Sequence, residues 1–200
     1  WTLNVPAADL AGLTDGSVTV TASVSDKAGN PASADHNLTV DVTVPAVTIH
    51  TVAGDDVINV AEHNQAQIIS GSATGAAAGD KVTVTIGGQT YTTVLDAAGN
   101  WSVGVPANVI SGLSDGTATV SVSVTDAAGN TGSGTHNVTV DTGLPSVSFN
   151  AISDDNVLNA VEKGQDLSVS GTSANLAEGT VVTVTLNGKN YSATTAADGS

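Results

Sequence analysis

The feature that most constrains this chain is an internal repeat of 100 residues that needs no gap. At that shift WTLNVPAADLAGLTDG, from Trp1, aligns with WSVGVPANVISGLSDG, from Trp101, and HNLTVD aligns with HNVTVD. About two positions in five are identical over the overlap, which is typical of tandem copies of one structural unit. The chain therefore holds two periods of one module, and the fold must be one that a segment of this length completes.

Apolar and polar residues alternate within each period. In KVTVTI, from Lys81, and TATVSVSV, from Thr117, every second residue is apolar, which places the apolar residues on one face of a strand. Similar short runs begin at Ala46, Gln67, Tyr91, Trp101 and His136. Turns rich in Gly, Asn, Asp and Pro separate the runs, and only ANVISGLSD suggests a helical turn. The pattern predicts an all-β fold of tandem immunoglobulin-like, seven-stranded β-sandwiches.

Domain boundaries are expected in VDVTVPAV, from Val40, and in VDTGLPSV, from Val140, because proline between two strands marks a linker. Boundaries near 41/42 and 141/142 divide the chain into three parts. Residues 1–41 would be the last part of one repeat, 42–141 a complete repeat, and 142–200 the first part of the next. This division predicts a longer parent protein, in which an export signal and further repeats lie elsewhere.

Composition excludes several classes of function. The chain has 19 acidic residues against 4 lysines and no arginine, so its net charge is −15. Such a surface repels nucleic acid and anionic lipid and attracts divalent cations. There is no cysteine, and no apolar run approaches the length of a membrane helix, so neither thiol chemistry nor direct membrane insertion is expected. We expect a structural and adhesive protein, not an enzyme.

The first candidate metal site is an acidic loop that occurs twice. GDDVINVAE, from Gly54, recurs as DDNVLNAVE, from Asp154, and calcium takes six to eight oxygen ligands of the kind found there. The EF-hand pattern is absent. The alternative is a solvated loop in which Asp and Asn satisfy turn backbone while Glu faces water. The candidate ligands are Asp55, Asp56, Asn59, Glu62, Asp154, Asp155, Asn159 and Glu162.

A second candidate site follows from the alternating strand directions, which gather acidic residues at both ends of a module. The candidates at the C-terminal end of a module are Asp15, Asp41, Asp115 and Asp141, and those at the N-terminal end are Asp96, Asp126 and Asn130. Carboxylates that face each other across a junction repel unless a cation lies between them, so calcium would stiffen the joint. The DAAGN segments also suit hairpin turns without metal, and the two roles are compatible.

The remaining polar and aromatic residues have ordinary interpretations. His36 and His136 recur without Cys or a paired His, which favours simple strand residues over zinc ligands. Trp1, Trp101, Tyr91 and Tyr191 are expected in the core, although an exposed Trp could bind sugar. Two alternatives therefore stay open: a carbohydrate-binding module, against which the 2% aromatic content counts, and a spacer module of a secreted enzyme.

The motifs DDxxNxxE, DxAGNW, GLxDG and VSVxDxAGN, repeated every 100 residues, resemble the bacterial Ig-like repeats of giant type I-secreted adhesins and biofilm-associated proteins. The resemblance implies a secreted protein of the bacterial surface whose repeats form a long stalk in adhesion or biofilm formation. It also implies Ca²⁺ at or near the junctions, bound by the acidic residues named above. The partners would be neighbouring repeats of the same chain, with a host-cell or matrix receptor bound elsewhere on the parent protein.

Overall fold

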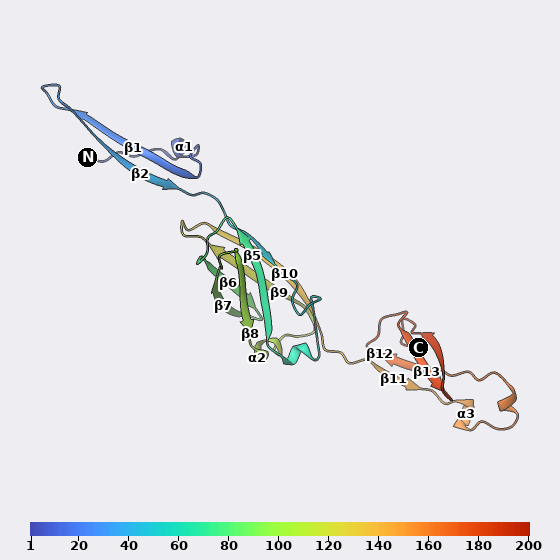
Figure 1. Ribbon diagram of the computed structural model, residues 1–200. Helices are drawn as coiled ribbons and strands as arrows, with labels where there is room; N and C mark the ends of the chain where they lie inside the picture. The colour runs from blue at the N-terminus through green and yellow to red at the C-terminus, as the bar shows by residue number, and fades with distance from the viewer. The chain divides into compact units, whose positions relative to one another are not determined.

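The computed structural model describes residues 1–200 and divides into two compact units, Trp1–Asp141 and Thr142–Ser200 (Figure 1). Most of the first unit is one complete sandwich between residues 46 and 141. We call this sandwich the central module. No helix in the chain is long and apolar enough to cross a membrane.

The central module consists of two sheets that enclose one apolar core. The three-stranded sheet has the order β3–β5–β8, from β3 (Ala46–Ile49), β5 (Gln67–Thr74) and β8 (Asn100–Val105). The five-stranded sheet has the order β4–β10–β9–β6–β7, from β4 (Val57–Asn59), β10 (Thr131–Asp141), β9 (Gly116–Thr125), β6 (Lys81–Ile86) and β7 (Gln89–Val94).

The predicted all-β, Ig-like fold class is confirmed, and the structure adds one strand to the expected seven. The added strand, β4, has three residues and pairs in parallel with β10, whereas every other pair is antiparallel. The expected helical turn is α2 (Ala107–Ile110), and it carries Ile110 into the core. A short 3₁₀ helix, η1 (Glu62–Asn64), follows β4.

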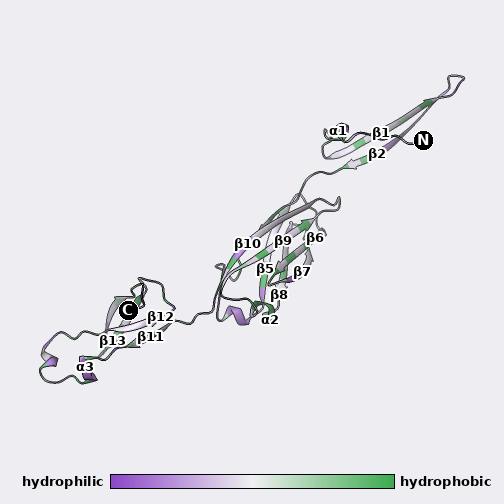
Figure 2. Ribbon diagram, turned by 180° about the vertical axis from the view of Figure 1, so that it is seen from behind, coloured by the Kyte–Doolittle hydropathy of each residue, from purple (hydrophilic) through white to green (hydrophobic).

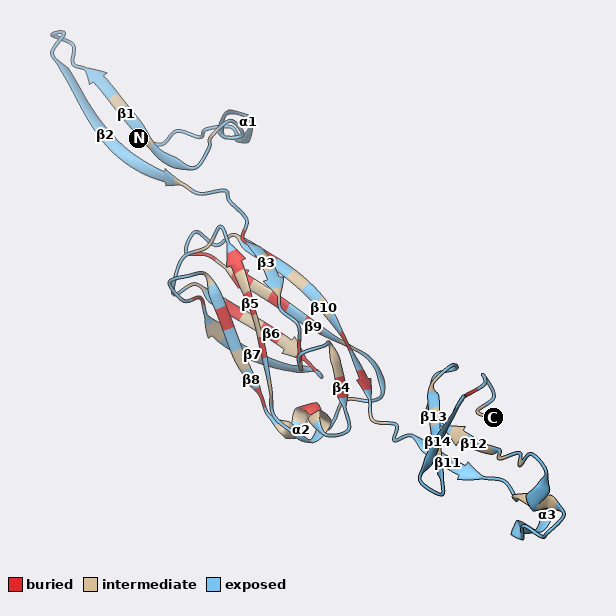
Figure 3. Ribbon diagram, turned by 45° about the vertical axis from the view of Figure 1, so that its right-hand side comes forward, coloured by how far each residue is buried: buried red, intermediate tan, exposed pale blue.

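Alternation along the strands builds the core as the sequence predicts. Val82 and Val84 on β6 lie opposite Val124 and Val122 on β9, and all four side chains are buried. Figure 3 shows that buried residues recur along the strands of the central module, and Figure 2 shows apolar and polar stretches on the same strands. The opposite face of the five-stranded sheet carries hydroxyl groups, such as Thr125 Oγ1 and Thr131 Oγ1, which lie 2.9 Å apart.

Residues 1–41 fold into one helical turn, α1 (Ala7–Leu10), and one hairpin, β1 (Gly16–Ser25) with β2 (Pro31–Val40). This hairpin repeats the register of β9 and β10, because Val18 pairs with Leu38 as Ala118 pairs with Val138. The N-terminal hairpin is therefore built like the C-terminal hairpin of the central module.

The second unit, Thr142–Ser200, repeats local structure from the other half of the module. Its sheets pair β11 (Ser146–Phe149) with β12 (Gly171–Ala174), and β13 (Val181–Leu186) with β14 (Lys189–Thr194). Ser146 lies opposite Ala174 as Ala46 lies opposite Thr74, so the register of β3 and β5 is kept. Two short helical segments, α3 (Ser153–Asn156) and η2 (Glu162–Gly164), lie between β11 and β12.

A glycine on β5 tests how closely the core is packed. A Cβ atom at Gly71 would lie 2.0 Å from the Thr48 carbonyl oxygen and 2.5 Å from the Trp101 ring. We therefore expect Gly71→Ala to lower the free energy of unfolding by about 1–3 kcal/mol, measured by urea unfolding. Gly104→Ala on β8 is the matched control, since a Cβ there meets nothing within 4 Å. Equal effects of the two substitutions would contradict this packing.

Candidate functional site

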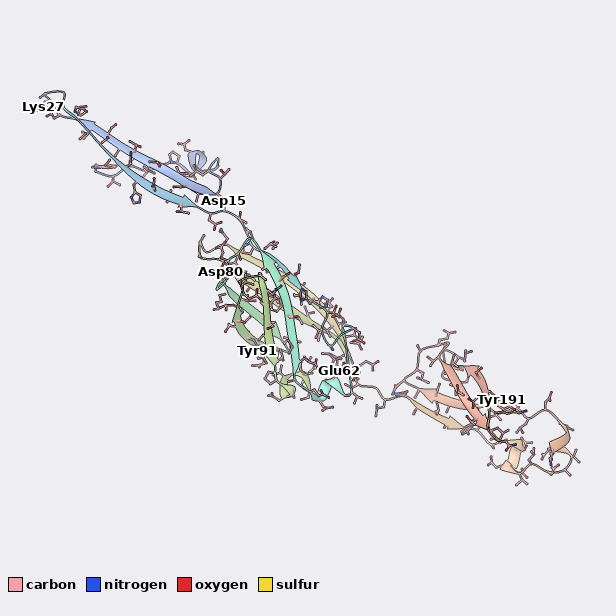
Figure 4. All side chains as sticks on the ribbon, viewed as in Figure 1. Asp15, Lys27, Glu62, Asp80, Tyr91 and Tyr191 are labelled. Atoms are coloured by element: carbon pink, nitrogen blue, oxygen red, sulfur yellow. The ribbon has the colours of Figure 1, made fainter.

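Acidic side chains of the central module gather at its two ends. At the C-terminal end, Asn59 on β4 lies in register with Asp141 on β10. The ring of His63 on η1 lies 2.9 Å from the Leu113 carbonyl oxygen, which brings η1 beside the loop that carries Asp115 into β9. Figure 4 shows Glu62 at this end and Asp80 at the opposite end.

The recurring residues of the 54–62 loop bond to their own backbone. The Asp55 carboxylate accepts the Val57 N–H at 3.0 Å. Asn59 Oδ1 accepts the Ala61 and Glu62 N–H groups, while Glu62 Oε2 accepts the Asn59 N–H at 3.1 Å. This reciprocal pair resembles a capping box, in which side chains three residues apart satisfy the free N–H groups of a helix start.

The second copy of the loop makes the same bonds. Asp155 accepts the Val157 N–H at 2.9 Å, and Asn159 and Glu162 repeat the reciprocal pair. Asp154, the remaining candidate there, has a left-handed backbone (φ 53°) and is exposed. The turn role, which the sequence offers as the alternative to a calcium loop, is therefore present in both copies. In both copies Glu also bonds back to the loop, whereas the sequence expects it to face water.

Asp56 links the loop to the last strand of the sandwich. Its Oδ1 accepts the Val52 N–H at 2.8 Å and lies 2.7 Å from His136 Nε2 on β10. These bonds, with His136 as the larger cause, hold the pKa of the Asp56 carboxyl below its usual value. The sequence favoured a plain strand role for His136, and no local pattern connects residues 80 positions apart.

Two candidates at the N-terminal end shape turns: Asp126 shapes the hairpin turn between β9 and β10, and Asp96 shapes the turn by which the chain crosses from β7 in one sheet to β8 in the other. Asp126 Oδ1 accepts the Gly129 and Asn130 N–H groups at 2.8 Å, and Asp126 Oδ2 accepts Asn130 Nδ2–H at 2.9 Å. The Asn130 side chain is the main cause of the lowered pKa of Asp126. Asp96 likewise accepts the Ala98 and Asn100 N–H groups at 2.8 Å, so the expected turn role of both aspartates is present.

The linker between β2 and β3 is held by side chains from both of its sides. The Asp15 carboxylate accepts the Thr43 hydroxyl and the Val42 N–H, and these bonds lower the pKa of Asp15. From the central module, Asn130 Nδ2 donates to the Asp41 carbonyl oxygen at 3.2 Å. We call Asp15, Asp41, Asp126 and Asn130 the linker cluster.

The linker cluster has oxygen ligands of the type that calcium prefers. A single nitrogen, Asn130 Nδ2, lies within hydrogen-bond distance of Asp126 Oδ2 and of the Asp41 carbonyl oxygen, so these two oxygens lie close to one point. Carboxylate and carbonyl oxygens are calcium ligands. No group of three or more His, Cys, Asp or Glu side chains is arranged to hold a metal ion, so any site would need backbone, amide or water oxygens as well.

The aromatic side chains of the central module belong to its core. Trp101 is 3% exposed, and Tyr91 packs against the buried cluster from β7. The expected core role is therefore present for these two residues. Trp1 and Tyr191, which the sequence also places in the core, are 101% and 55% exposed.

Comparison with known families identifies the module. The profile of the bacterial Ig-like domain family matches residues 43–142. A search of curated proteins found no match.

Similar solved structures include parts of a 1.5-MDa bacterial ice-binding adhesin, at 36% identity over 100% of this chain and 66% of that one, with a TM-score of 0.48. A Ca²⁺-stabilized adhesin of an Antarctic bacterium matches with 40% sequence identity and a TM-score of 0.45. The match covers 100% of this chain and 50% of that adhesin structure. An Ig-like domain of the M. primoryensis ice-binding adhesin matches with 44% sequence identity and a TM-score of 0.40. The match covers 50% of this chain and 100% of that domain. The chain thus spans less than two thirds of the first two structures.

The Asp56–His136 contact predicts a specific dependence of stability on pH. Because the folded-state pKa of Asp56 lies below the ordinary 3.8, the contact stabilises the fold above that pH and is lost as pH falls through the folded pKa. We expect Asp56→Asn to lower the urea midpoint at neutral pH, with the difference from the parent chain vanishing at acid pH. Asn156, at the equivalent position, accepts the Ile152 N–H at 2.9 Å, so asparagine preserves the loop.

Asp55→Asn is the control for this prediction, because it removes the same charge from the same loop without touching His136. A difference between Asp56→Asn and the parent chain that stays constant across the pH series would contradict the assignment.

Proposed function

The chain belongs to the family of bacterial Ig-like domains, and we propose that it is a stalk segment of a large bacterial surface adhesin. In this proposal residues 42–141 are one complete repeat, while 1–41 and 142–200 are parts of its neighbours. The modules extend the protein and carry load and do not catalyse a reaction. The resemblance of the recurring motifs to giant adhesins supports a secreted, surface-attached protein in which another segment binds the host-cell or matrix receptor.

The observation that carries the proposal is the hydrogen-bonded linker. Only residues 41–45 separate β2 from β3, and Pro45, the last of them, is buried. Asp15 binds the linker from one side and Asn130 from the other. A stalk needs joints that keep successive modules in line, and a short linker held at both sides restricts bending more than a free chain does.

We propose further that Ca²⁺ binds at the linker cluster and stiffens the joint. Asp15, Asp41 and Asp126 bring three carboxylates to this short stretch, and their mutual repulsion falls when a cation binds. Extracellular calcium modules bind at about 10⁻⁴–10⁻³ M, so the chain would stiffen on reaching the outside of the cell. Asp96 would contribute at the same, N-terminal end of the central module. Asp115 and Asp141 would be the corresponding ligands at its C-terminal end.

The two 54–62-type loops remain secondary candidates for Ca²⁺. Asp55 and Glu62 each accept a backbone N–H with one carboxylate oxygen, and the second oxygen of each carboxylate would bind the cation. Asn59 has a single side-chain oxygen, which accepts two N–H groups and would have to be shared with the cation. Asp56 is the weakest candidate, because its Oδ1 already serves Val52 and His136.

Calcium binding at the linker cluster is tested with Asp126→Asn, which keeps an acceptor for the turn but removes a charged ligand. With Ca²⁺ at ten times its dissociation constant, we expect the parent chain to gain about 1.4 kcal/mol of stability over the chelator-treated sample. We also expect small-angle scattering to show a narrower range of dimensions. Asp126→Asn should lose most of both effects.

Asp26→Asn is the matched control. Asp26 forms the same turn as Asp126, accepting the Ala28 and Asn30 N–H groups, but it lies at the tip of the N-terminal hairpin. A chain whose melting and scattering are identical with Ca²⁺ and with chelator would refute the calcium proposal. If Asp26→Asn and Asp126→Asn lost the calcium-dependent stability and scattering changes equally, the placement of the calcium site at the linker cluster would be refuted.

A further inference from the structure

Thr43 connects the two structures that flank the first linker. Its hydroxyl donates to the carboxylate of Asp15, the residue directly before β1. Its Cγ2 methyl lies beside the central module, where a Cβ added at Gly75 would be 2.9 Å from it. Gly75 follows β5 and has a positive φ of 73°. One threonine side chain thus holds the linker both to the hairpin before it and to the module after it.

Positions 43 and 75 change together in the next period. Gly143 replaces Thr43, and Asn175 replaces Gly75. Asn175 keeps the left-handed backbone of that position, with a φ of 56°, which asparagine tolerates better than most residues with a side chain. Its Nδ2 donates to the Leu144 carbonyl oxygen at 2.8 Å. The second linker is therefore tied to the unit that follows it by the side chain of residue 175, not by that of residue 143.

Steric fit explains why the two positions are coupled. A side chain at position 75 would meet the Thr43 methyl at 2.9 Å, which is closer than normal contact, so threonine at 43 requires glycine at 75. Glycine at 143 removes that methyl, and an asparagine is then accommodated at 175. The exchange has a cost, because Gly143 has no hydroxyl that could bind the Asp115 carboxylate as Thr43 binds Asp15.

The two linkers share the proline that precedes the next strand. Pro45 comes directly before β3, and Pro145 directly before β11. A proline restricts the backbone at its own position and at the one before it, so this part of both linkers is equally stiff. The linkers therefore differ most in backbone freedom at position 43 or 143, where glycine, the least restricted residue, replaces a β-branched one.

We propose that the stalk contains two kinds of joint, determined by the residues at positions 43 and 75 of each period. The Thr–Gly pair of the first linker holds the linker from both sides and makes a stiff joint. The Gly–Asn pair of the second linker holds it to the unit that follows and makes Gly143 a hinge. Sequence, and not only ion concentration, then decides where the stalk bends. This use of the pair rests on the proposed stalk role, whereas the difference in flexibility needs no calcium.

The two joints are compared in the 200-residue chain by backbone ¹⁵N relaxation, with chelator present so that calcium contributes nothing. We expect order parameters near the rigid-backbone value of about 0.85 at residues 42–44, and lower values, toward about 0.6, at residues 142–144. Gly143→Thr combined with Asn175→Gly should raise the values at 142–144 to those of the first linker. The reverse exchange, Thr43→Gly with Gly75→Asn, should lower the values at 42–44.

Gly143→Val combined with Asn175→Gly is the matched control, because valine has the shape of threonine but no hydroxyl. We expect it to recover only part of the rigidity, since valine cannot bind the Asp115 carboxylate. Gly143→Thr alone should also fall short of the double exchange, because Asn175 stays where the threonine methyl has to pack. Thr142 is kept in every variant, so its hydroxyl cannot account for the differences. Unchanged chemical shifts of the central-module amides show that the module is intact in each variant.

Three results would overturn this proposal. The first is equal order parameters in the two linkers of the parent chain. The second is a double exchange that leaves residues 142–144 as mobile as before, and the third is equal rigidity of the valine and threonine variants at position 143. Because every measurement is made without calcium, a failure of the calcium proposal would leave these outcomes unaffected and can be told apart from them.

Discussion

The valine ladder between β6 and β9 is the interaction on which the rest of the structure depends. Val82 and Val84 meet Val124 and Val122, and none of these side chains is more than 2% exposed. Strand side chains alternate between faces, so a slip of one residue would turn these valines to solvent and bring threonines and serines into the core. The ladder fixes the register of the five-stranded sheet and thereby the positions of the turns at its two ends.

That constraint also determines where charge can lie. The outward positions of β6, β9 and β10 are mostly threonine and serine, which suit a strand surface and add no charge. Most aspartates lie in turns and linkers, where carboxylates such as those of Asp55, Asp96 and Asp126 accept backbone N–H groups that no strand partner satisfies. The acidity of the chain is thus concentrated at the ends of the module, and this is why the chemistry of a stalk built from such modules belongs to its joints.

The sequence predicts the parts of this structure that follow from local patterns. Alternation located the seven main strands, and the single helical turn was found in ANVISGLSD. The strand β4 was missed because three residues are too few to alternate, and its partner β10 lies about 80 positions away. The same distance hid the contact between Asp56 and His136. Asn59 and Glu62 form a capping pair and stay candidate ligands, because a capping pair and a metal pair use the same oxygens at the same spacing.

Comparison of the two periods separates what the fold requires from what the joint requires. Core residues vary between periods, as Ile58 becomes Leu158 and Leu38 becomes Val138, because a core tolerates apolar exchange when volume is roughly kept. The DG pair at Asp15 and Asp115, the AGN turn at 28–30 and 128–130, and the aspartate and proline of the linker recur unchanged. Each depends on particular atoms: a carboxylate for linker N–H groups, a glycine at positive φ, an amide that reaches a neighbouring carbonyl. Residues that bond through specific atoms are harder to exchange for others of similar volume, which accounts for the recurrence of these positions. The joint is not invariant, since Thr43 becomes Gly143 and Asp96 becomes Ala196.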